Sequence, residues 1–112
     1  MIKKNYVLRF LFLLLISFFL PFSFANASSL SGENLFKLHC SVCHAGGNNI
    51  IIPEKNLKKE TLKENGMDTI SAISYQILNG KNGMPGFCGR LTEEEIELIA
   101  GYILEKAETD FK

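Results

Sequence analysis

Apolar residues recur with a helical period in two stretches of the second half of the chain. The first stripe consists of Ile70, Ile73, Ile77 and Leu78. The second stripe consists of Ile96, Ile99, Ala100 and Ile103. Asp68 precedes the first stripe as a candidate cap, and Thr92 precedes the second and forms a capping box with Glu95. We therefore predict one helix over 69–78 and another after Thr92.

Shorter helices are predicted nearer the middle of the chain. Ser31 can cap a helix over 32–43, and Gly66 can end another over 59–65. The apolar triplet at 50–52 is too short for a strand and has no partner run, so we predict a buried extended segment there. No two stretches have the pattern of paired strands. The predicted fold class is a small all-α domain with long glycine-rich loops.

The first 27 residues (1–27) have a different pattern from the rest. A short basic start precedes an apolar run over 10–20, Pro21 ends the run, and a small-x-small site ends at Ala27. This layout predicts an export signal peptide that is cleaved after Ala27, leaving 28–112 as the mature domain. The alternative is an uncleaved membrane anchor, but the run is shorter than the roughly 20 apolar residues that span a bilayer.

The net charge of the chain differs once residues 1–27 are counted separately. The 112 residues hold 12 basic and 12 acidic side chains, but the first 27 hold three bases and no acid. The other 85 residues therefore have a net charge of −3, which argues against a nucleic-acid-binding protein. They are too few for a multi-domain enzyme and give a marginal core, so we expect something else to fill its centre.

Cys40, Cys43 and His44 form the motif C-x-x-C-H, the attachment signature of a c-type haem. Two cysteines three residues apart lie on one face of a helical turn, so both sulfurs can form thioether bonds at one edge of the macrocycle. The histidine that follows can bind the iron from the same side. We predict one covalently bound haem c, attached through Cys40 and Cys43, with His44 as an iron ligand.

Other interpretations of these cysteines fit less well. A thioredoxin-like redox pair needs a βαβ setting, which the pattern does not provide. A zinc site needs about four ligands, and His39 could complete the set, but His39 and Cys40 are adjacent and point apart. The third cysteine, Cys88, makes an odd number, which cannot form a complete disulfide framework.

A haem iron that carries electrons needs a sixth ligand, and three side chains are candidates. His39 cannot easily reach the opposite face of the haem, and Met67 stands at a helix boundary, where a methionine is more often core filler. Met84 lies in a glycine-rich loop stiffened by Pro85, which can deliver a thioether to the iron. We therefore predict Met84 as the ligand. His/Met ligation leaves no open position, so we expect electron transfer and no enzyme activity.

Four segments have a recognisable pattern: CSVCHAGGNN at 40–49, IPEKNLKK at 52–59, ISYQ at 73–76 and NGKNGMPGF at 79–87. Together they resemble the cytochrome c6 family, also called soluble cytochrome c-553, and the resemblance covers nearly all of 30–105. It implies a class I cytochrome c fold around one haem. It also implies that Cys40 and Cys43 hold the haem and that His44 and Met84 are its axial ligands.

The same resemblance implies a function and a location. The family's members are soluble one-electron carriers of photosynthesis, which take electrons from cytochrome f of the cytochrome b6f complex and pass them to photosystem I. The expected location is the thylakoid lumen of a plastid, or of a cyanobacterium. A mostly monomeric protein without membrane insertion is expected after the signal peptide is removed. A composition rich in Phe, Ile, Asn and Lys, with only two Arg, is compatible with a plastid gene.

Three further residues carry expectations. The resemblance implies that Gln76 lies near Met84, where it can tune the potential; the alternative is an exposed helical residue. Arg90 is expected to help docking near the exposed haem edge, while residues 89–112 carry a net charge of −4 and form an acidic face. Cys88 departs from the family, which has a small residue there. It is either a tolerated substitution or a free thiol that permits a disulfide-linked dimer.

Three alternative functions stay open at this point. One is a bacterial periplasmic cytochrome that serves a terminal oxidase or reductase. Another is a haem-based gas sensor or peroxidase, which would need a weak or absent sixth ligand. The last is a metal-binding or thiol-redox module that uses Cys40 and Cys43.

Overall fold

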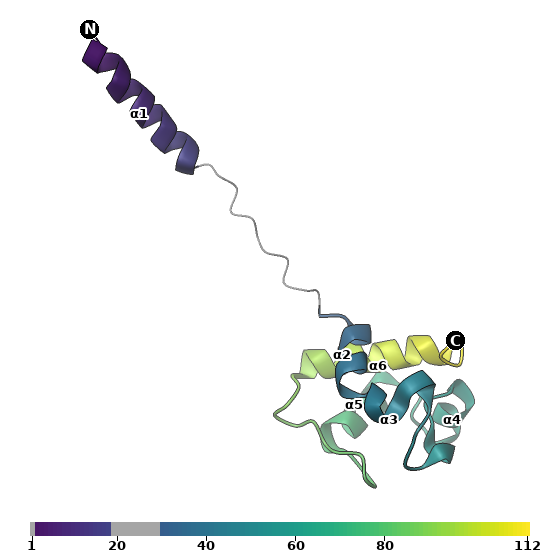
Figure 1. Cartoon of the computed structure of the whole chain (residues 1–112). Helices are drawn as coiled ribbons and strands as arrows, with labels where there is room; N and C mark the ends of the chain where they lie inside the picture. Colours follow the sequence, from purple (N-terminus) through teal and green to yellow (C-terminus); the bar gives the residue numbers. More distant parts are fainter. Residues whose placement is uncertain (1, 19–29) are drawn as a thin grey trace.

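The computed structural model of the protein describes residues 2–18 and 30–112 (Figure 1). The first range is helix α1 (Ile2–Phe18), in which all side chains from Lys3 to Ile16 are exposed. Among the helices in these two ranges, none combines the length and apolar character needed to cross a membrane. The predicted cleavage site after Ala27 lies outside the described residues.

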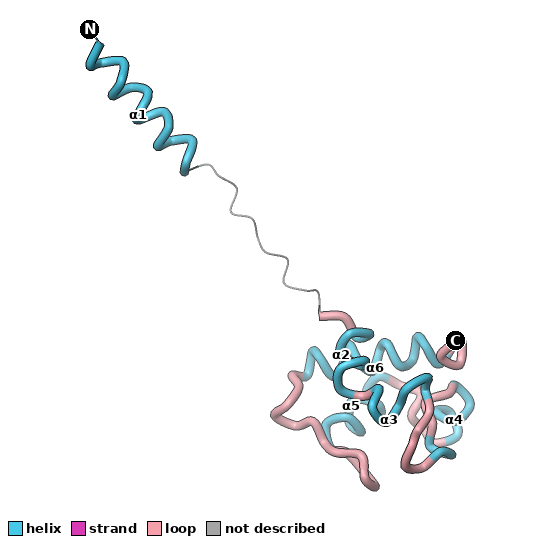
Figure 2. Tube along the Cα trace, in the orientation of Figure 1, coloured by secondary structure: helices cyan, strands magenta, loops and turns pink. Residues whose placement is uncertain are grey.

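The second range folds as a helical domain with long connecting loops (Figure 2). Its elements are α2 (Gly32–His39), α3 (Ser41–His44), the 3-10 turns η1 (Ala45–Gly47) and η2 (Pro53–Lys55), α4 (Lys59–Glu64), α5 (Ile70–Asn79) and α6 (Glu93–Ala107). Within 30–112 the β-type pairing is limited to two isolated bridges, so the predicted all-α class is confirmed.

Helix α6 begins where the sequence predicts. The Thr92 hydroxyl accepts the Glu95 amide at 3.2 Å, and the Glu95 carboxylate accepts the Thr92 amide at 2.8 Å, which completes the capping box. Helix α2 crosses α6 so closely that a Cβ on Gly32 would lie 2.8 Å from the Cβ of Tyr102. Phe36 then packs against the Tyr102 ring, with the ring centroids 5.3 Å apart.

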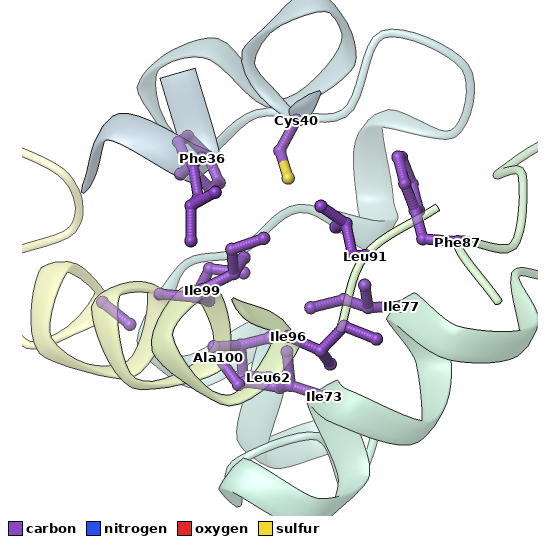
Figure 3. Packing of buried hydrophobic residues seen from close by; sticks show 13 residues of the cluster. Phe36, Cys40, Leu62, Ile73, Ile77, Phe87, Leu91, Ile96, Ile99 and Ala100 are labelled. Carbon is purple, nitrogen blue, oxygen red and sulfur yellow. The ribbon is translucent and has the colours of Figure 1, made fainter. Parts of the chain in front are cut away.

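The core gathers buried apolar side chains from α2, α4, α5, α6 and the loop after α5 (Figure 3). Its members are Leu35, Phe36, Cys40, Leu62, Ile73, Ile77, Phe87, Leu91, Ile96, Ile99, Ala100, Ile103 and Ala107. Both predicted stripes are represented in this cluster, which explains why α5 and α6 pack together. Of the first stripe, Leu78 is half-buried against this cluster, and Ile70 is exposed at the start of α5.

Three local predictions were wrong. The helix predicted over 32–43 is divided at Cys40, which caps the end of α2 and the start of α3 with φ −116 and ψ −32. Thr69 caps α5 in place of Asp68, and its hydroxyl accepts the Ala72 amide at 3.2 Å. The segment at 50–52 is not buried, because Ile50 and Ile51 are 66% and 54% exposed.

Candidate haem-binding site

The attachment motif lies at the junction of α2 and α3, in what we call the attachment segment (40–48). The Cys40 amide closes α2 by donating to the Phe36 carbonyl at 2.8 Å. The amides of Cys43 and His44 then both fold back onto the Cys40 carbonyl, at 3.1 and 2.9 Å. This single turn of backbone holds the two cysteines and the histidine of the motif together.

The Cys40 side chain points into the core. Figure 3 shows its sulfur directed toward the centre of the buried cluster. Burial, together with the smaller effect of the nearby Cys43, raises the pKa of the Cys40 thiol to about 11. Without a thioether bond, the Cys40 thiol is therefore neutral at physiological pH, which suits its apolar environment.

The His44 ring is oriented by a backbone carbonyl. Its Nδ1 lies 2.8 Å from the Asn48 carbonyl oxygen. A carbonyl oxygen only accepts, so Nδ1 carries the proton and Nε2 of the neutral ring keeps its lone pair. Gly46 and Gly47, with φ of 63 and 74, turn the chain so that this carbonyl faces back toward the ring.

The end of the chain supports the same turn. Phe111 packs against Gly47 so tightly that a Cβ there would lie 2.7 Å from the Cγ atom of the ring. Its ring also contacts Phe36 of α2, with centroids 5.9 Å apart. Asp110 and Phe111 both have positive φ, 50 and 61, which costs backbone energy in residues other than glycine. The packing of Phe111 offsets that cost.

Met84 is held by a two-residue turn, the Met84 turn (81–84). Lys81 and Met84 exchange two backbone hydrogen bonds, each 3.0 Å long. The central residues Asn82 and Gly83 have φ of 48 and 88, the pattern of the type I′ turn that Asn-Gly favours. Gly80 lets the chain pass this turn closely, because a Cβ there would lie 2.5 Å from the Gly86 nitrogen.

Gln76 reaches Met84 from helix α5. Its Nε2 lies 3.8 Å from the Met84 sulfur, the distance of a weak N–H to sulfur hydrogen bond, and the residue is half-buried. The alternative of a fully exposed helical residue is therefore wrong. The structure agrees with the expectation that Gln76 lies beside Met84.

These elements surround a cavity of about 370 Å³ inside the domain. Cys40, Cys43, His44, Gln76 and Met84 all line it, together with apolar side chains from α2, α4, α5 and α6. The other two candidate sixth ligands, His39 and Met67, line it as well. A cavity with an apolar wall, two thiols and an imidazole with a free Nε2 has the chemistry that covalently attached haem requires.

Sequence reasoning missed two cationic side chains at this cavity. Lys55 and Lys81 line it, and Lys81 belongs to the same turn as Met84, so a base other than Arg90 also lies beside that loop. The Arg90 guanidinium lies over the Phe87 ring, 4.7 Å from its centroid, and Phe87 in turn lines the cavity. Lys55 lies in the segment 52–59 and Lys81 in the segment 79–87, both of which carry the family resemblance. Their place in these segments could have indicated that they lie near the haem site.

The zinc alternative finds no support in the described parts of the chain. Across 2–18 and 30–112, no group of three or more His, Cys, Asp and Glu side chains is arranged to hold a metal ion. Cys88 is exposed and lies apart from the other two cysteines in the loop after α5. It does not line the cavity.

A small helical domain built around a cavity with a C-x-x-C-H turn on its wall defines a class I c-type cytochrome. The family model described as cytochrome c oxidase, cbb3-type, subunit III matches residues 27–103. Cytochrome c6 of Bumilleriopsis filiformis is 55% identical over 78 residues, which cover 70% of this chain and 91% of that protein. Cytochrome c6 of Pyropia yezoensis is 49% identical over 106 residues, which cover 95% of this chain and 96% of that protein.

A solved structure agrees with these sequence relatives. The crystal structure of cytochrome c6 from the diatom Phaeodactylum tricornutum matches with a TM-score of 0.68 at 48% identity, covering 70% of this chain and 93% of that one. The chain belongs to the cytochrome c6 family. It carries one covalently bound haem c with its iron, and Cys40 and Cys43 are the cysteines of its attachment motif.

Proposed function

We propose that this c-type cytochrome is a soluble electron carrier of photosynthesis. It accepts one electron from cytochrome f of the cytochrome b6f complex and delivers it to photosystem I in the thylakoid lumen. The observation that carries the proposal is the meeting of Cys40, Cys43, His44 and Met84 around one cavity, from segments far apart in the sequence. Membership of the cytochrome c6 family supports the choice of partners.

In this proposal, His44 and Met84 would hold the haem iron. When bound, the haem supplies a metal centre that takes up and releases one electron. The Asn48 carbonyl fixes the His44 tautomer, which keeps Nε2 available as a ligand. Gln76 holds an N–H beside the Met84 sulfur and so restricts that side chain. The apolar wall excludes water, which favours a high reduction potential.

The proposed ligands argue against two of the open alternatives. A gas sensor or peroxidase needs an accessible sixth position, whereas a thioether ligand on a short turn fills it. A thiol-redox module needs two free thiols, whereas Cys40 and Cys43 are used for attachment. The optical spectrum of the purified protein tests both points. A c-type reduced spectrum without ready binding of carbon monoxide supports the proposal, and rapid carbon monoxide binding contradicts it.

The surface charge supports transient docking with redox partners. The acidic side chains of α6 give one face a negative field, and Arg90 places a cation beside the wall of the cavity. We assign Arg90 to docking near that wall. If Arg90→Glu leaves the salt-dependent rate of electron transfer to photosystem I unchanged, this role is wrong. Interfaces of this kind are small, so no tight complex is expected.

The export segment completes the proposal. Residues 1–27 act as a signal peptide that is removed after Ala27, so the mature domain starts at residue 28. The match to the Bumilleriopsis protein supports this, since 78 residues cover 91% of that relative but only 70% of this chain. Mass spectrometry of the protein isolated from its native compartment tests the site, because an N-terminus other than residue 28 contradicts it.

A direct assay tests the function as a whole. Reduction by cytochrome f and oxidation by flash-excited photosystem I are measured with the haem-loaded protein. Saturable rates that fall with ionic strength are expected in both directions. The description of the family model gives a second candidate, electron delivery to a terminal oxidase. Rapid turnover with an oxidase, together with slow transfer to photosystem I, favours that second function.

A further inference from the structure

Three Asn-Gly pairs occur in the described chain, at 65–66, 79–80 and 82–83. An asparagine before glycine can lose its side-chain amide spontaneously, because glycine has no side chain to hinder attack by its own backbone nitrogen. The reaction requires that nitrogen to be free and the asparagine side chain to be mobile. The three pairs therefore differ according to their hydrogen bonds.

In two of the pairs, both the asparagine side chain and the glycine amide are hydrogen-bonded. The Gly66 amide donates to the Lys63 carbonyl at 3.1 Å, and the Asn65 side chain bonds to the Thr61 carbonyl and to the Lys55 ammonium. The Gly80 amide donates to the Gln76 carbonyl at 2.7 Å. The Asn79 side chain donates to the Tyr75 carbonyl at 2.8 Å. Both pairs sit at helix ends that must unwind before they can react.

In the third pair, Asn82 and Gly83, neither of these groups is hydrogen-bonded within 30–112. Within 30–112, neither the Asn82 side chain nor the Gly83 amide has a hydrogen-bond partner, and both residues are exposed. Two backbone hydrogen bonds between Lys81 and Met84 close the turn around them. The turn needs to open only locally for the Gly83 nitrogen to approach the side chain, which is the kind of low-cost fluctuation that loop tips undergo.

The geometry points to Asn82 as the site of a spontaneous deamidation that places a negative charge on the wall of the haem cavity. The deprotonated Gly83 nitrogen bonds to Cγ of Asn82, and the Cγ–Nδ2 bond breaks to release ammonia. Water then opens the resulting succinimide at either carbonyl and yields aspartate or isoaspartate. Water is the only co-reactant, and nothing is oxidised or reduced.

The position of Asn82 gives the change a consequence. Asn82 lines the cavity, whereas Asn79 does not. A carboxylate there disfavours the added electron, so the reduction potential falls. Isoaspartate also lengthens the backbone of the two-residue turn that carries Met84. This second effect depends on the proposed Met84 ligation, while the site of modification does not.

Peptide mapping of aged protein tests the site. The haem-loaded protein is incubated at mildly alkaline pH and digested with trypsin, which cleaves after Lys81 and Arg90 and so isolates Asn82 from the other two asparagines. Aspartate and isoaspartate are expected at position 82 roughly tenfold faster than at 65 or 79, the factor that one retained backbone hydrogen bond represents. Equal rates at the three positions, or no conversion at 82, overturn the proposal.

Two variants test the consequence. Asn82→Gly keeps a turn that Gly-Gly also forms and removes the reactive side chain, so its potential should not drift during ageing while that of the wild type falls. Asn82→Asp should lower the potential of fresh protein more than Asn79→Asp, which adds the same charge away from the cavity. Equal shifts in the two aspartate variants, or equal drift with and without Asn82, overturn the consequence. Redox titration of a Met84→Ala variant tests the ligation separately.

Discussion

The attachment segment and the Met84 turn bring the proposed iron ligands His44 and Met84 to one cavity by different means. The attachment segment (40–48) continues from a helix, and its amides fold back onto the Cys40 carbonyl. It is covered by Phe111 and holds the His44 ring through the Asn48 carbonyl. The Met84 turn (81–84) has two backbone hydrogen bonds, one side-chain contact from Gln76 and exposed residues at its tip.

The attachment segment is therefore held rigidly, whereas the position of the Met84 side chain is adjustable. Covalent attachment needs the two sulfurs and the imidazole in fixed relative positions, and a helical turn provides them. A thioether ligand binds iron without a covalent tether, so its strength depends on how firmly the turn is held. We therefore expect changes in the attachment segment to affect the whole fold and changes near Met84 to affect mainly the potential.

The largest effect is expected when both attachment cysteines are removed. Cys40→Ala with Cys43→Ala leaves the cavity without its covalent filling. At roughly 24 cal/mol per Å³, a cavity of 370 Å³ represents at most about 9 kcal/mol, comparable to the stability of a whole domain. The variant should lose haem on a denaturing gel and most of its helical circular dichroism. Cys88→Ala is the control, and a double variant that melts like the wild type contradicts the expectation.

Met84→Ala tests the other half of the comparison. It should leave the haem attached and the fold intact, open the sixth position to carbon monoxide, and lower the potential by a fraction of the roughly 0.8 V range that axial ligands set. Met67→Ala removes the same side chain from another part of the cavity lining and should cost stability alone. Redox titration and carbon monoxide binding measure both variants. Equal potentials in the two variants contradict the assignment of Met84.

The sequence predicted local features of the chain better than contacts between distant segments. The C-x-x-C-H motif and the Thr92 capping box are contiguous patterns with fixed spacing, so their chemistry is visible without a fold. The division of the first helix at Cys40 was missed because helical propensity continues through it. Burial of the Cys40 sulfur in the core depends on tertiary packing, which overrides that local preference.

Contacts between distant segments needed the structure. No local pattern connects Phe111 to Gly47 or identifies Asn48 as the partner of His44. The turn at Met84 was predicted as a loop, and Asn-Gly is a strong turn signal, but the side chain that restrains Met84 comes from helix α5. The likeness to the cytochrome c6 family, rather than periodicity, placed Gln76 near Met84.

Gly80→Ala tests how firmly the Met84 turn is held. A Cβ at this position would lie 2.5 Å from the Gly86 nitrogen and 2.6 Å from the Pro85 carbonyl carbon, and the φ of 68 adds strain. The turn should shift, with a loss of about 2 kcal/mol and a lower potential. Gly66→Ala is matched in φ, at 66, but meets nothing within 4 Å, so it should cost stability without changing the potential. Redox titration and thermal unfolding separate the two.

Phe111→Ala tests the support of the attachment segment. Removing a half-buried ring should cost about 2 kcal/mol and lower the melting temperature. Because the ring covers Gly47, amides at 46–48 should also exchange faster with solvent while the haem stays attached. Phe111→Leu keeps most of the apolar contact and should recover most of the loss. If hydrogen-exchange protection at 46–48 is unchanged in Phe111→Ala, the attachment segment does not depend on the Phe111 ring.

Thr92→Ala gives the smallest effect and serves as the reference for the comparison. The hydroxyl caps α6 on the exposed side of the domain and does not line the cavity. Its removal should cost about 1 kcal/mol in denaturant unfolding, because the Glu95 amide loses its partner. The potential should stay that of the wild type, since neither the attachment segment nor the Met84 turn is touched. A shift in potential as large as that of Gly80→Ala would mean that general loosening of the fold, rather than the hold on Met84, sets the potential.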